Sequence, residues 1–232
     1  IKIKTIIYPQ KKNVINTAQK SLINIAKINN INIYHIKNLL NKKTIILLKN
    51  INPHLIIVAS YGAIFPNKIL KIPFIGCINI HASLLPKLRG SSPIQQSILN
   101  NEKYTGITII IMNKKIDDGK ILYKNIITIK NNYSNDILNL NLAHLSSKIL
   151  IRNIKNIISN NFLKIKQNKN LTSTTHKIIK KNGKINWNLS ANKINKQINA
   201  YINWPSSYTI FNYKKIQIIK TKIKIKITIF KP

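Results

Sequence analysis

Two short apolar runs constrain the fold of this chain more than any other feature. They are LIIVASYG at 55–62 and GCINIH at 76–81. Neither shows the strict alternation of apolar and polar residues expected of a strand with one face in water. Both are therefore predicted to be strands buried on both faces. Such strands belong to parallel sheets covered by helices, so the sequence predicts an α/β protein.

Apolar spacing predicts further elements along the chain. Strands are expected at 3–8, 31–36, 105–112 and 120–129, and helices at 21–30, 91–101, 134–161 and 190–201. Strands alternate with helices over most of this length, which indicates a mostly parallel, Rossmann-like sheet. Residues 162–186 are polar and are expected to form a loop. The Ile-Lys alternation at 222–227 predicts a strand with one face in water.

The net charge is large but ambiguous. The 39 Lys and Arg residues face only 4 Asp and Glu residues, which gives a formal net charge of +35. A charge of this size ordinarily points to a nucleic-acid partner. The Lys residues are spread along the whole chain, however, and Ile, Lys and Asn all have A/T-rich codons. A biased genome would give the same charge, and both interpretations stay open.

Cysteine content and hydropathy exclude several classes of protein. A single Cys, Cys77, rules out an internal disulfide and a zinc site built from several cysteines. The basic start lacks the apolar stretch of a signal peptide, and the apolar runs are too short to span a bilayer. A cytoplasmic protein with no metal and no membrane partner is expected. The chain begins with Ile and its only Met is Met112, so initiation is unusual or the start lies upstream.

Two polar side chains near the end of the second apolar run suggest chemistry. Asn79 and His81 are two residues apart on a predicted strand, so their side chains point to the same face. They lie at its C-terminal end, where ligands bind in open α/β sheets. An Asn amide can stabilise a developing oxyanion, and an imidazole can move a proton near neutral pH. The pair alone also fits a structural His and a turn-forming Asn.

A carboxylate strengthens the catalytic interpretation. The chain has only four acidic residues, Glu102, Asp117, Asp118 and Asp136. Two of them adjoin in the turn IDDGK between the predicted strands 105–112 and 120–129. A carboxylate beside His81 would stabilise the imidazolium and orient the ring. Taken alone, the two Asp residues fit a turn before Gly119 equally well.

These residues lie in segments that resemble methionyl-tRNA formyltransferases. The segments are GCINIHASLLPKLRGSSPIQ (76–95), TGITIIIM (105–112) and IDDGKIL (116–122). The continuation RGSSPIQ (89–95) separates them from glycinamide ribonucleotide formyltransferases and from typical sugar-nucleotide formyltransferases. The stretch GKINWNLSANKINKQINAYINWPSSY (183–208) matches the same family, and the resemblance covers about residues 3 to 213.

The resemblance implies an activity and a site. The formyl group of 10-formyltetrahydrofolate would pass to the α-amine of methionyl-initiator tRNA, for translation initiation, with no metal. The catalytic positions would be Asn79, His81 and Asp117, and the folate-contacting loop would be Ser83, Leu84, Leu85 and Pro86. Candidate contacts to tRNA are Lys11, Lys12 and Arg89, although each Lys taken singly fits a solvated surface charge at least as well. The protein is expected to be a monomer.

The resemblance also implies a domain layout and two departures from it. A formyltransferase catalytic domain is expected at 1–165, a linker at 166–182, and a truncated, OB-barrel-like tRNA-binding region at 183–232. Family members carry a strand and helix before the segment matching residues 1–8, so a strand edge is expected to be exposed. The match to the C-terminal domain stops early, so only the first strands of a five-stranded barrel are expected.

Two other functions remain open at this level. One is a related folate-dependent formyltransferase that acts on a nucleotide or sugar amine. The other is a degenerate, non-catalytic basic RNA-binding protein, which the two shortened ends favour and the intact Asn79, His81 and Asp117 oppose.

Overall fold

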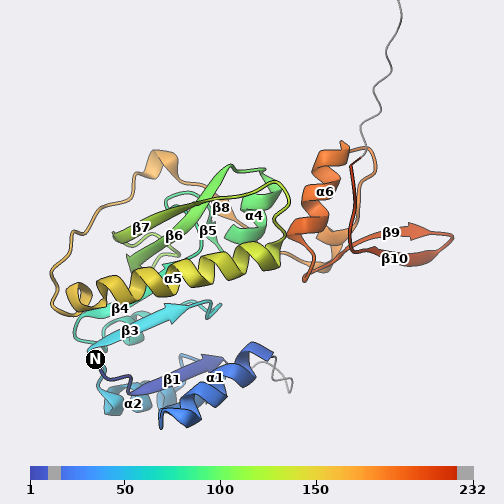
Figure 1. Cartoon of the computed structure of the whole chain (residues 1–232). Helices are drawn as coiled ribbons and strands as arrows, with labels where there is room; N and C mark the ends of the chain where they lie inside the picture. Colours follow the sequence, from blue (N-terminus) through green and yellow to red (C-terminus); the bar gives the residue numbers. More distant parts are fainter. Residues whose placement is uncertain (10–16, 224–232) are drawn as a thin grey trace, which may run out of the picture. The chain divides into compact units, whose positions relative to one another are not determined.

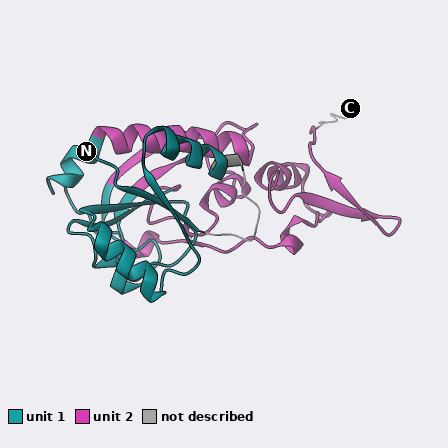
Figure 2. Cartoon of the chain, turned by 90° about the horizontal axis from the view of Figure 1, so that it is seen from below, with its two compact units in different colours: residues 1–81, 109–122, 153–167 teal, residues 82–108, 123–152, 168–232 magenta. Residues whose placement is uncertain are grey.

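The computed structural model of the chain describes residues 1–9 and 17–223 (Figure 1). These residues divide into two compact units, each made of separate stretches of sequence (Figure 2). Unit 1 comprises residues 1–81, 109–122 and 153–167, and unit 2 comprises residues 82–108, 123–152 and 168–232. The two units are described separately.

Unit 1 begins with a strand–helix–strand segment. β1 (Thr5–Pro9) pairs in parallel with β2 (Asn32–Ile36), and α1 (Thr17–Ile28) connects them. This agrees with the predicted strands and helix to within a few residues. A helix is the usual connection here, because parallel neighbours cannot be joined by a tight turn.

Two helices of unit 1 were not predicted from the sequence. They are α2 (Lys42–Ile51) and the short α3 (Asn67–Leu70). The side chain of Asn41 caps α2 by accepting a hydrogen bond from the backbone N–H of Lys43, and Asn52 ends it in a left-handed conformation. Both cap residues are asparagines, which suit these positions. In so Asn-rich a chain, Asn does not stand out as a cap.

The strands β3 (Leu55–Ala59) and β4 (Gly76–His81) pair in parallel, with Val58 opposite Asn79. They belong to a sheet of order β3-β4-β6-β7, separate from the β1–β2 pair. β3 is therefore an edge strand, and Ile57 on it is 43% exposed. The prediction that this apolar run is buried on both faces was wrong, because Ile57 and Ala59 on one face are exposed, whereas Val58 on the other face is buried. The predicted exposed strand edge is found here.

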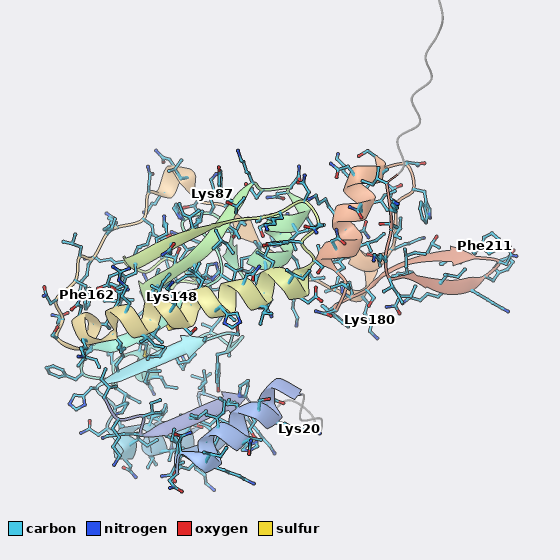
Figure 3. All side chains as sticks on the ribbon, viewed as in Figure 1. Lys20, Lys87, Lys148, Phe162, Lys180 and Phe211 are labelled. Atoms are coloured by element: carbon cyan, nitrogen blue, oxygen red, sulfur yellow. The ribbon has the colours of Figure 1, made fainter. Side chains whose placement is uncertain are left out.

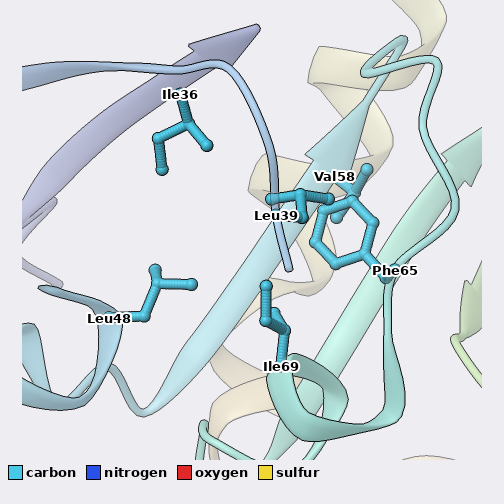
Figure 4. Close-up of a cluster of buried hydrophobic side chains, with 6 residues drawn as sticks. All are labelled: Ile36, Leu39, Leu48, Val58, Phe65 and Ile69. Atoms are coloured by element: carbon cyan, nitrogen blue, oxygen red, sulfur yellow. The ribbon is translucent and has the colours of Figure 1, made fainter. Parts of the chain in front are cut away.

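The core of unit 1 joins its two sheets. Six buried apolar side chains pack into one cluster: Ile36, Leu39, Leu48, Val58, Phe65 and Ile69 (Figure 4). They come from the end of β2, from the loop after it, from α2, from β3 and from the segment through α3. Each side chain removed from water contributes about 1.5–3 kcal/mol. Apolar packing thus holds β1 and β2 near β3 without backbone pairing between the sheets.

The strands β6 (Tyr104–Ile111) and β7 (Ile121–Thr128) run from one unit into the other. The N–H of Ile111 donates to the carbonyl of Lys120, and the N–H of Ile129 donates to the carbonyl of Lys103. The end of β6 thus bonds next to the start of β7, and the start of β6 next to the end of β7, which identifies an antiparallel pair. The predicted pairing of these strands around the turn IDDGK is confirmed.

Besides two short 3-10 helices at Lys169–Leu171 and Lys180–Gly183, unit 2 contains the remaining α-helices. These are α4 (Pro93–Leu99), most of α5 (Asn135–Ile158) and α6 (Ala191–Ala200). All three were predicted, and Pro93 and the Ser190 cap mark two of the starts. The short β5 (Arg89–Gly90) and β8 (Thr174–Thr175) pair in parallel.

The end of the described chain forms a small antiparallel hairpin. β9 (Ser207–Phe211) pairs with β10 (Lys214–Ile218). A cluster of Ile185, Ile194 and Ile198, with Ile218 packed against it, attaches the hairpin to α6. The predicted strand at 222–227 lies almost entirely outside the described residues. In the part of the chain that the structure describes, no helix is both long and apolar enough to cross a membrane.

Candidate active site

β4 carries two of the predicted site residues to the C-terminal end of the sheet in unit 1. Asn79 is half-buried, and the side chain of His81 is only 6% exposed. The intervening Ile80 points to the other face, as alternation along a strand requires. Cys77, two residues before Asn79, is also buried, and burial raises the pKa of its thiol to about 12. A buried residue thus anchors the strand just before the two site residues.

The carboxylate of Asp117 lies against both of these side chains. Asn79 donates a hydrogen bond from Nδ2 to Oδ1 of Asp117, at 3.1 Å. The imidazole Nδ1 of His81 lies 3.5 Å from Oδ2 of the same carboxylate. That distance makes an ion-pair contact when the imidazole is protonated, and it is too long for a strong hydrogen bond. The structure therefore brings together in unit 1 all three residues predicted from the sequence.

A left-handed turn presents Asp117 in this position. Its φ is +49°, a conformation that Asp tolerates better than most residues. Gly119 follows two residues later, where an added Cβ would lie 1.6 Å from the carbonyl oxygen of Ile111. Only glycine fits so close to the end of β6. The choice of Gly at 119 thus fixes the turn that aims Asp117 at β4.

Gln167 also holds this turn, and it was not predicted as a site residue. Its Nε2 donates to the backbone carbonyls of Asp117 and Gly119, both at 2.8 Å, and the side chain is buried. Two good hydrogen bonds to adjacent carbonyls restrict the turn to one geometry. Gln167 lies 50 residues after Asp117 in a polar stretch with no periodic pattern. No local signal marks it.

The predicted folate loop lies in unit 2 and is organised around Thr108. The hydroxyl of Thr108 donates to the carbonyl of Ser83 at 2.7 Å and accepts from the N–H of Leu85 at 3.1 Å. Ser83, Leu85 and Thr108 are fully buried, whereas Leu84 and Pro86 are half-buried. The Leu85–Pro86 peptide bond is cis. One hydroxyl therefore satisfies two backbone groups that a tight loop would otherwise leave unpaired.

Lys124 makes a further contact to the same loop. Its Nζ donates to the carbonyl of Leu85 at 2.5 Å, and partial burial lowers the pKa of the ammonium group. Ser83 closes the loop from within by donating its hydroxyl proton to the carbonyl of Lys87. Side-chain contacts thus hold the loop at three of its backbone carbonyls, those of Ser83, Leu85 and Lys87.

The predicted tRNA contacts are only partly described. The backbone of Arg89 is held by β8, because its N–H donates to the carbonyl of Ser173 and its carbonyl accepts from the hydroxyl of Thr175. Gly90 packs so closely that an added Cβ would lie 2.5 Å from the carbonyl oxygen of Thr175. Lys11 and Lys12 lie outside the described residues.

A cavity of about 410 Å³ lies elsewhere in unit 1. Its lining residues are Ile45, Lys49, Asn52, Lys68, Lys71 and Ile72. Asn52 and Ile72 precede β3 and β4, so this cavity adjoins the N-terminal ends of the strands. Asn79 and His81 lie toward the opposite ends. Among residues 1–9 and 17–223, no group of three or more His, Cys, Asp or Glu side chains is placed to hold a metal ion.

The segment that contains Asn79, His81 and Asp117 lies within the match to one family of known proteins. The family described as formyl transferase matches residues 3–154, and the formyl transferase C-terminal domain matches residues 177–228. The chain belongs to the formyl transferase family. Its α/β fold is the formyltransferase fold.

Relatives in sequence share one name. The methionyl-tRNA formyltransferase of Caldicellulosiruptor saccharolyticus is 40% identical over 183 residues, which are 79% of this chain and 58% of that protein. The methionyl-tRNA formyltransferase of Ehrlichia canis is 42% identical over 172 residues, or 74% of this chain and 55% of that protein. The chain therefore spans little more than half the length of these relatives.

Solved structures with the same fold include a different type of formyltransferase. WlaRD, a sugar 3-N-formyltransferase crystallised with dTDP and 5-N-formyltetrahydrofolate, superimposes with a TM-score of 0.72 at 27% identity. The match covers 93% of this chain and 74% of that one. The fold alone therefore does not distinguish a tRNA substrate from a sugar substrate.

Proposed function

We propose that this chain transfers the formyl group of 10-formyltetrahydrofolate to the α-amine of methionyl-initiator tRNA, for translation initiation. The observation that carries the proposal is the convergence of Asn79 and His81 on the Asp117 carboxylate. An amide donor, an imidazole and a carboxylate can together supply the oxyanion stabilisation and proton transfer that assist acyl transfer to an amine. The shared name of the sequence relatives supports methionyl-tRNA as the acceptor.

The reaction forms one C–N bond and breaks another. The methionyl nitrogen attacks the formyl carbon, and the formyl oxygen becomes an oxyanion. The bond from that carbon to N10 of the folate then breaks, and N10 takes up the proton that the amine loses. The products are formyl-methionyl-tRNA and tetrahydrofolate, so no further reactant is needed.

Asn79 and His81 stabilise the oxyanion in this scheme. An amide carries two N–H groups, so Asn79 can keep its bond to Asp117 while the other N–H donates to the oxyanion. His81 presents Nδ1 to Asp117, which directs Nε2 toward the substrate. The protonated ring stabilises negative charge there and carries a proton to N10, together with a bound water. Asp117 orients the ring and balances its charge.

The loop of Ser83, Leu84, Leu85 and Pro86 is proposed to contact the folate. Because Thr108 and Lys124 occupy the loop's own backbone groups, the loop is rigid before the folate binds. A rigid loop loses less conformational entropy on binding than a mobile one. WlaRD, which shares the fold, was crystallised with a folate, and this supports a folate site in this chain.

The proposal assigns the parts of the chain as follows. Residues 1–165 form the catalytic domain, 166–182 a linker and 183–232 a shortened tRNA-binding region. The two family matches, 3–154 and 177–228, support this division. Lys11, Lys12 and Arg89 are proposed to contact the tRNA, and the enzyme is proposed to act as a cytoplasmic monomer.

A second candidate acceptor is the amine of a nucleotide-linked sugar. The similarity to WlaRD favours it. One assay separates the two: the chain is incubated with 10-formyltetrahydrofolate and either initiator methionyl-tRNA or a dTDP-linked amino sugar, and products are identified by mass spectrometry. N-formylmethionine released from the tRNA is the expected product. The matched control is tRNA carrying N-acetylmethionine, whose blocked amine must give no product. Formylation of the sugar alone would contradict the proposal.

A further inference from the structure

The β9–β10 hairpin ends in a two-residue turn with an unusual residue. Phe211 pairs with Lys214, so Asn212 and Tyr213 form the turn. Their φ angles are +46° and +59°. Positive φ at both central positions defines the type I′ turn, which favours Asn followed by Gly. Asn212 fits this preference, but Tyr213 stands where glycine is strongly favoured.

Packing of the Tyr213 side chain does not offset this strain. A bulky side chain in the left-handed region destabilises the turn. Tyr213 is nevertheless fully exposed, and its neighbour Phe211 is 64% exposed. Figure 3 shows Phe211 at the far end of the hairpin. Strained residues that pack against nothing point to a role outside the fold.

Basic residues follow the turn, and no acidic residue lies near it in the sequence. Lys214 and Lys215 follow Tyr213 directly, and no acidic residue follows Asp136 anywhere in the sequence. Nζ of Lys215 lies 4.0 Å from the centre of the Tyr208 ring, on the same hairpin. Lysine ammonium groups and exposed aromatic rings are the two features by which proteins hold single-stranded nucleic acid.

We infer that the hairpin tip, defined as Phe211, Asn212, Tyr213 and Lys214, binds unpaired nucleotides of RNA. Tyr213 stacks on a base, and Lys214 contacts a neighbouring phosphate. A lipid surface suits the tip less well, because membrane insertion requires a cluster of apolar side chains, and the tip contains only one, Phe211. The inference rests on the proposed tRNA substrate for the identity of the RNA. The tip contains none of the residues proposed for formyl transfer.

The test is the substitution Tyr213→Gly, which affects stability and binding in opposite directions. Glycine relieves the strain, so the melting temperature should rise by about 2 °C or more. Affinity for a labelled single-stranded RNA of about a dozen nucleotides, measured by fluorescence anisotropy, should fall about tenfold. Affinity for a duplex of equal length, closed at both ends by hairpin loops of abasic linker, should stay within about twofold, because its paired bases stack on one another and leave no free face for Tyr213.

Two control variants sharpen the result. Tyr213→Phe keeps the ring and should bind single-stranded RNA as the unmodified chain does. Phe74→Ala removes another exposed aromatic residue, which is 90% exposed in unit 1, and should leave RNA binding unchanged. Unchanged single-strand affinity in Tyr213→Gly would overturn the inference. So would an equal loss for the duplex, or a loss seen only with vesicles of phosphatidylserine and phosphatidylcholine.

Formyl transfer is measured separately, so the two proposals fail in different ways. If the chain formylates no methionyl-tRNA but Tyr213→Gly loses single-strand binding selectively, the RNA site stands and the proposed activity does not. If formyl transfer is found and single-strand binding is unaffected, the activity stands and the RNA site does not.

Discussion

Asn79 and Asp117 lie 38 residues apart in the sequence, and the amide of the first donates a hydrogen bond to the carboxylate of the second. This contact fastens the end of β4 to the turn between β6 and β7. It also places the carboxylate where His81, two residues along β4, meets its other oxygen. One acidic side chain thereby positions both of the polar groups proposed to act on the formyl oxygen.

Replacing Asp117 with Asn tests the role of its negative charge. The new amide oxygen still accepts the bond from Asn79, but nothing balances the imidazolium of His81. The rate of formyl transfer should fall at least ~100-fold, the usual size of acid–base and oxyanion contributions. Steady-state assays with both substrates saturating measure this.

Asp118→Asn is the matched control, because it removes one carboxylate from the same turn. Its rate should stay within about threefold of the unmodified enzyme. An Asp117→Asn variant as active as the Asp118→Asn variant would show that the Asp117 charge has no catalytic part.

Gln167 is expected to act as a positioning residue. Gln167→Ala removes both hydrogen bonds that hold the Asp117 turn and leaves two carbonyls unpaired. The free energy of unfolding should fall by about 1–3 kcal/mol, as measured in urea. The turnover number should fall about tenfold with little change in the KM for folate, because the turn and not the folate loop is disturbed.

Gln96→Ala is the control for this variant, because the side chain of Gln96 has one described hydrogen bond, to the side chain of Asn100 on α4. It should change neither stability nor turnover appreciably. If Gln167→Ala lost stability without any loss of turnover at a temperature where it is folded, Gln167 would be purely structural.

Thr108 offers a complementary substitution in the folate loop. Thr108→Val keeps the shape of the side chain but removes the hydroxyl that bridges Ser83 and Leu85. Stability should fall by about 1–3 kcal/mol, and the KM for 10-formyltetrahydrofolate should rise more than the turnover number falls. Thr108→Ser keeps the hydroxyl and should restore the KM. A Thr108→Val enzyme with an unchanged KM would separate this loop from folate binding.

Cys77 reports on the integrity of β4. Burial raises the pKa of its thiol to about 12, so the thiol stays protonated at pH 8. Iodoacetamide should therefore not modify the folded protein, and it should modify the protein fully in urea. Mass spectrometry follows the reaction. Rapid modification without urea would mean that β4 opens readily, contrary to its place in the sheet.

Lys196 should make stability increase with pH. Its side chain is buried in α6, where Nζ reaches only the carbonyl of Asn131 among the described contacts, and burial lowers the pKa of its ammonium group. The unfolded chain therefore binds the proton more tightly than the folded chain. Stability contributed by this group rises as the pH passes from the lowered folded pKa toward 10.5.

Lys196→Met removes the buried charge and should raise the melting temperature at pH 7 while flattening this pH dependence. Lys193→Met, at an exposed position of the same helix, should do neither. Equal melting temperatures for Lys196→Met and the unmodified chain at pH 7 would mean that burial of this ammonium group costs nothing.

Local sequence patterns predicted most elements of the fold. The strand at 76–81 was predicted with the same bounds that the structure shows. The bounds predicted for the helix Asn135–Ile158 differ from the observed ones by a few residues. The prediction failed for α2 and α3, whose Asn and Pro caps are indistinct in this composition. The burial of β3 was also mispredicted, because a strand's neighbours are set by distant segments and not by its own residues.

The residues of the candidate site also fall into those predicted from the sequence and those that were missed. Asn79, His81 and Asp117 were selected from strand alternation, from the rarity of acidic residues and from a family resemblance, and the structure brings them together. Gln167 and Thr108 were missed. Each acts through backbone carbonyls and amides of another segment, and such contacts leave no pattern in the residues themselves.

The most direct test of the proposed activity is the single-turnover rate of formyl transfer to initiator methionyl-tRNA by this chain and its His81 variants. His81→Ala and the bulkier, polar His81→Gln should both transfer formyl at least ~100-fold more slowly while keeping the circular dichroism spectrum of the unmodified chain. Transfer by either variant at the unmodified rate would contradict the assignment of His81. If the unmodified chain transfers no formyl group to methionyl-tRNA, the proposed activity itself is contradicted.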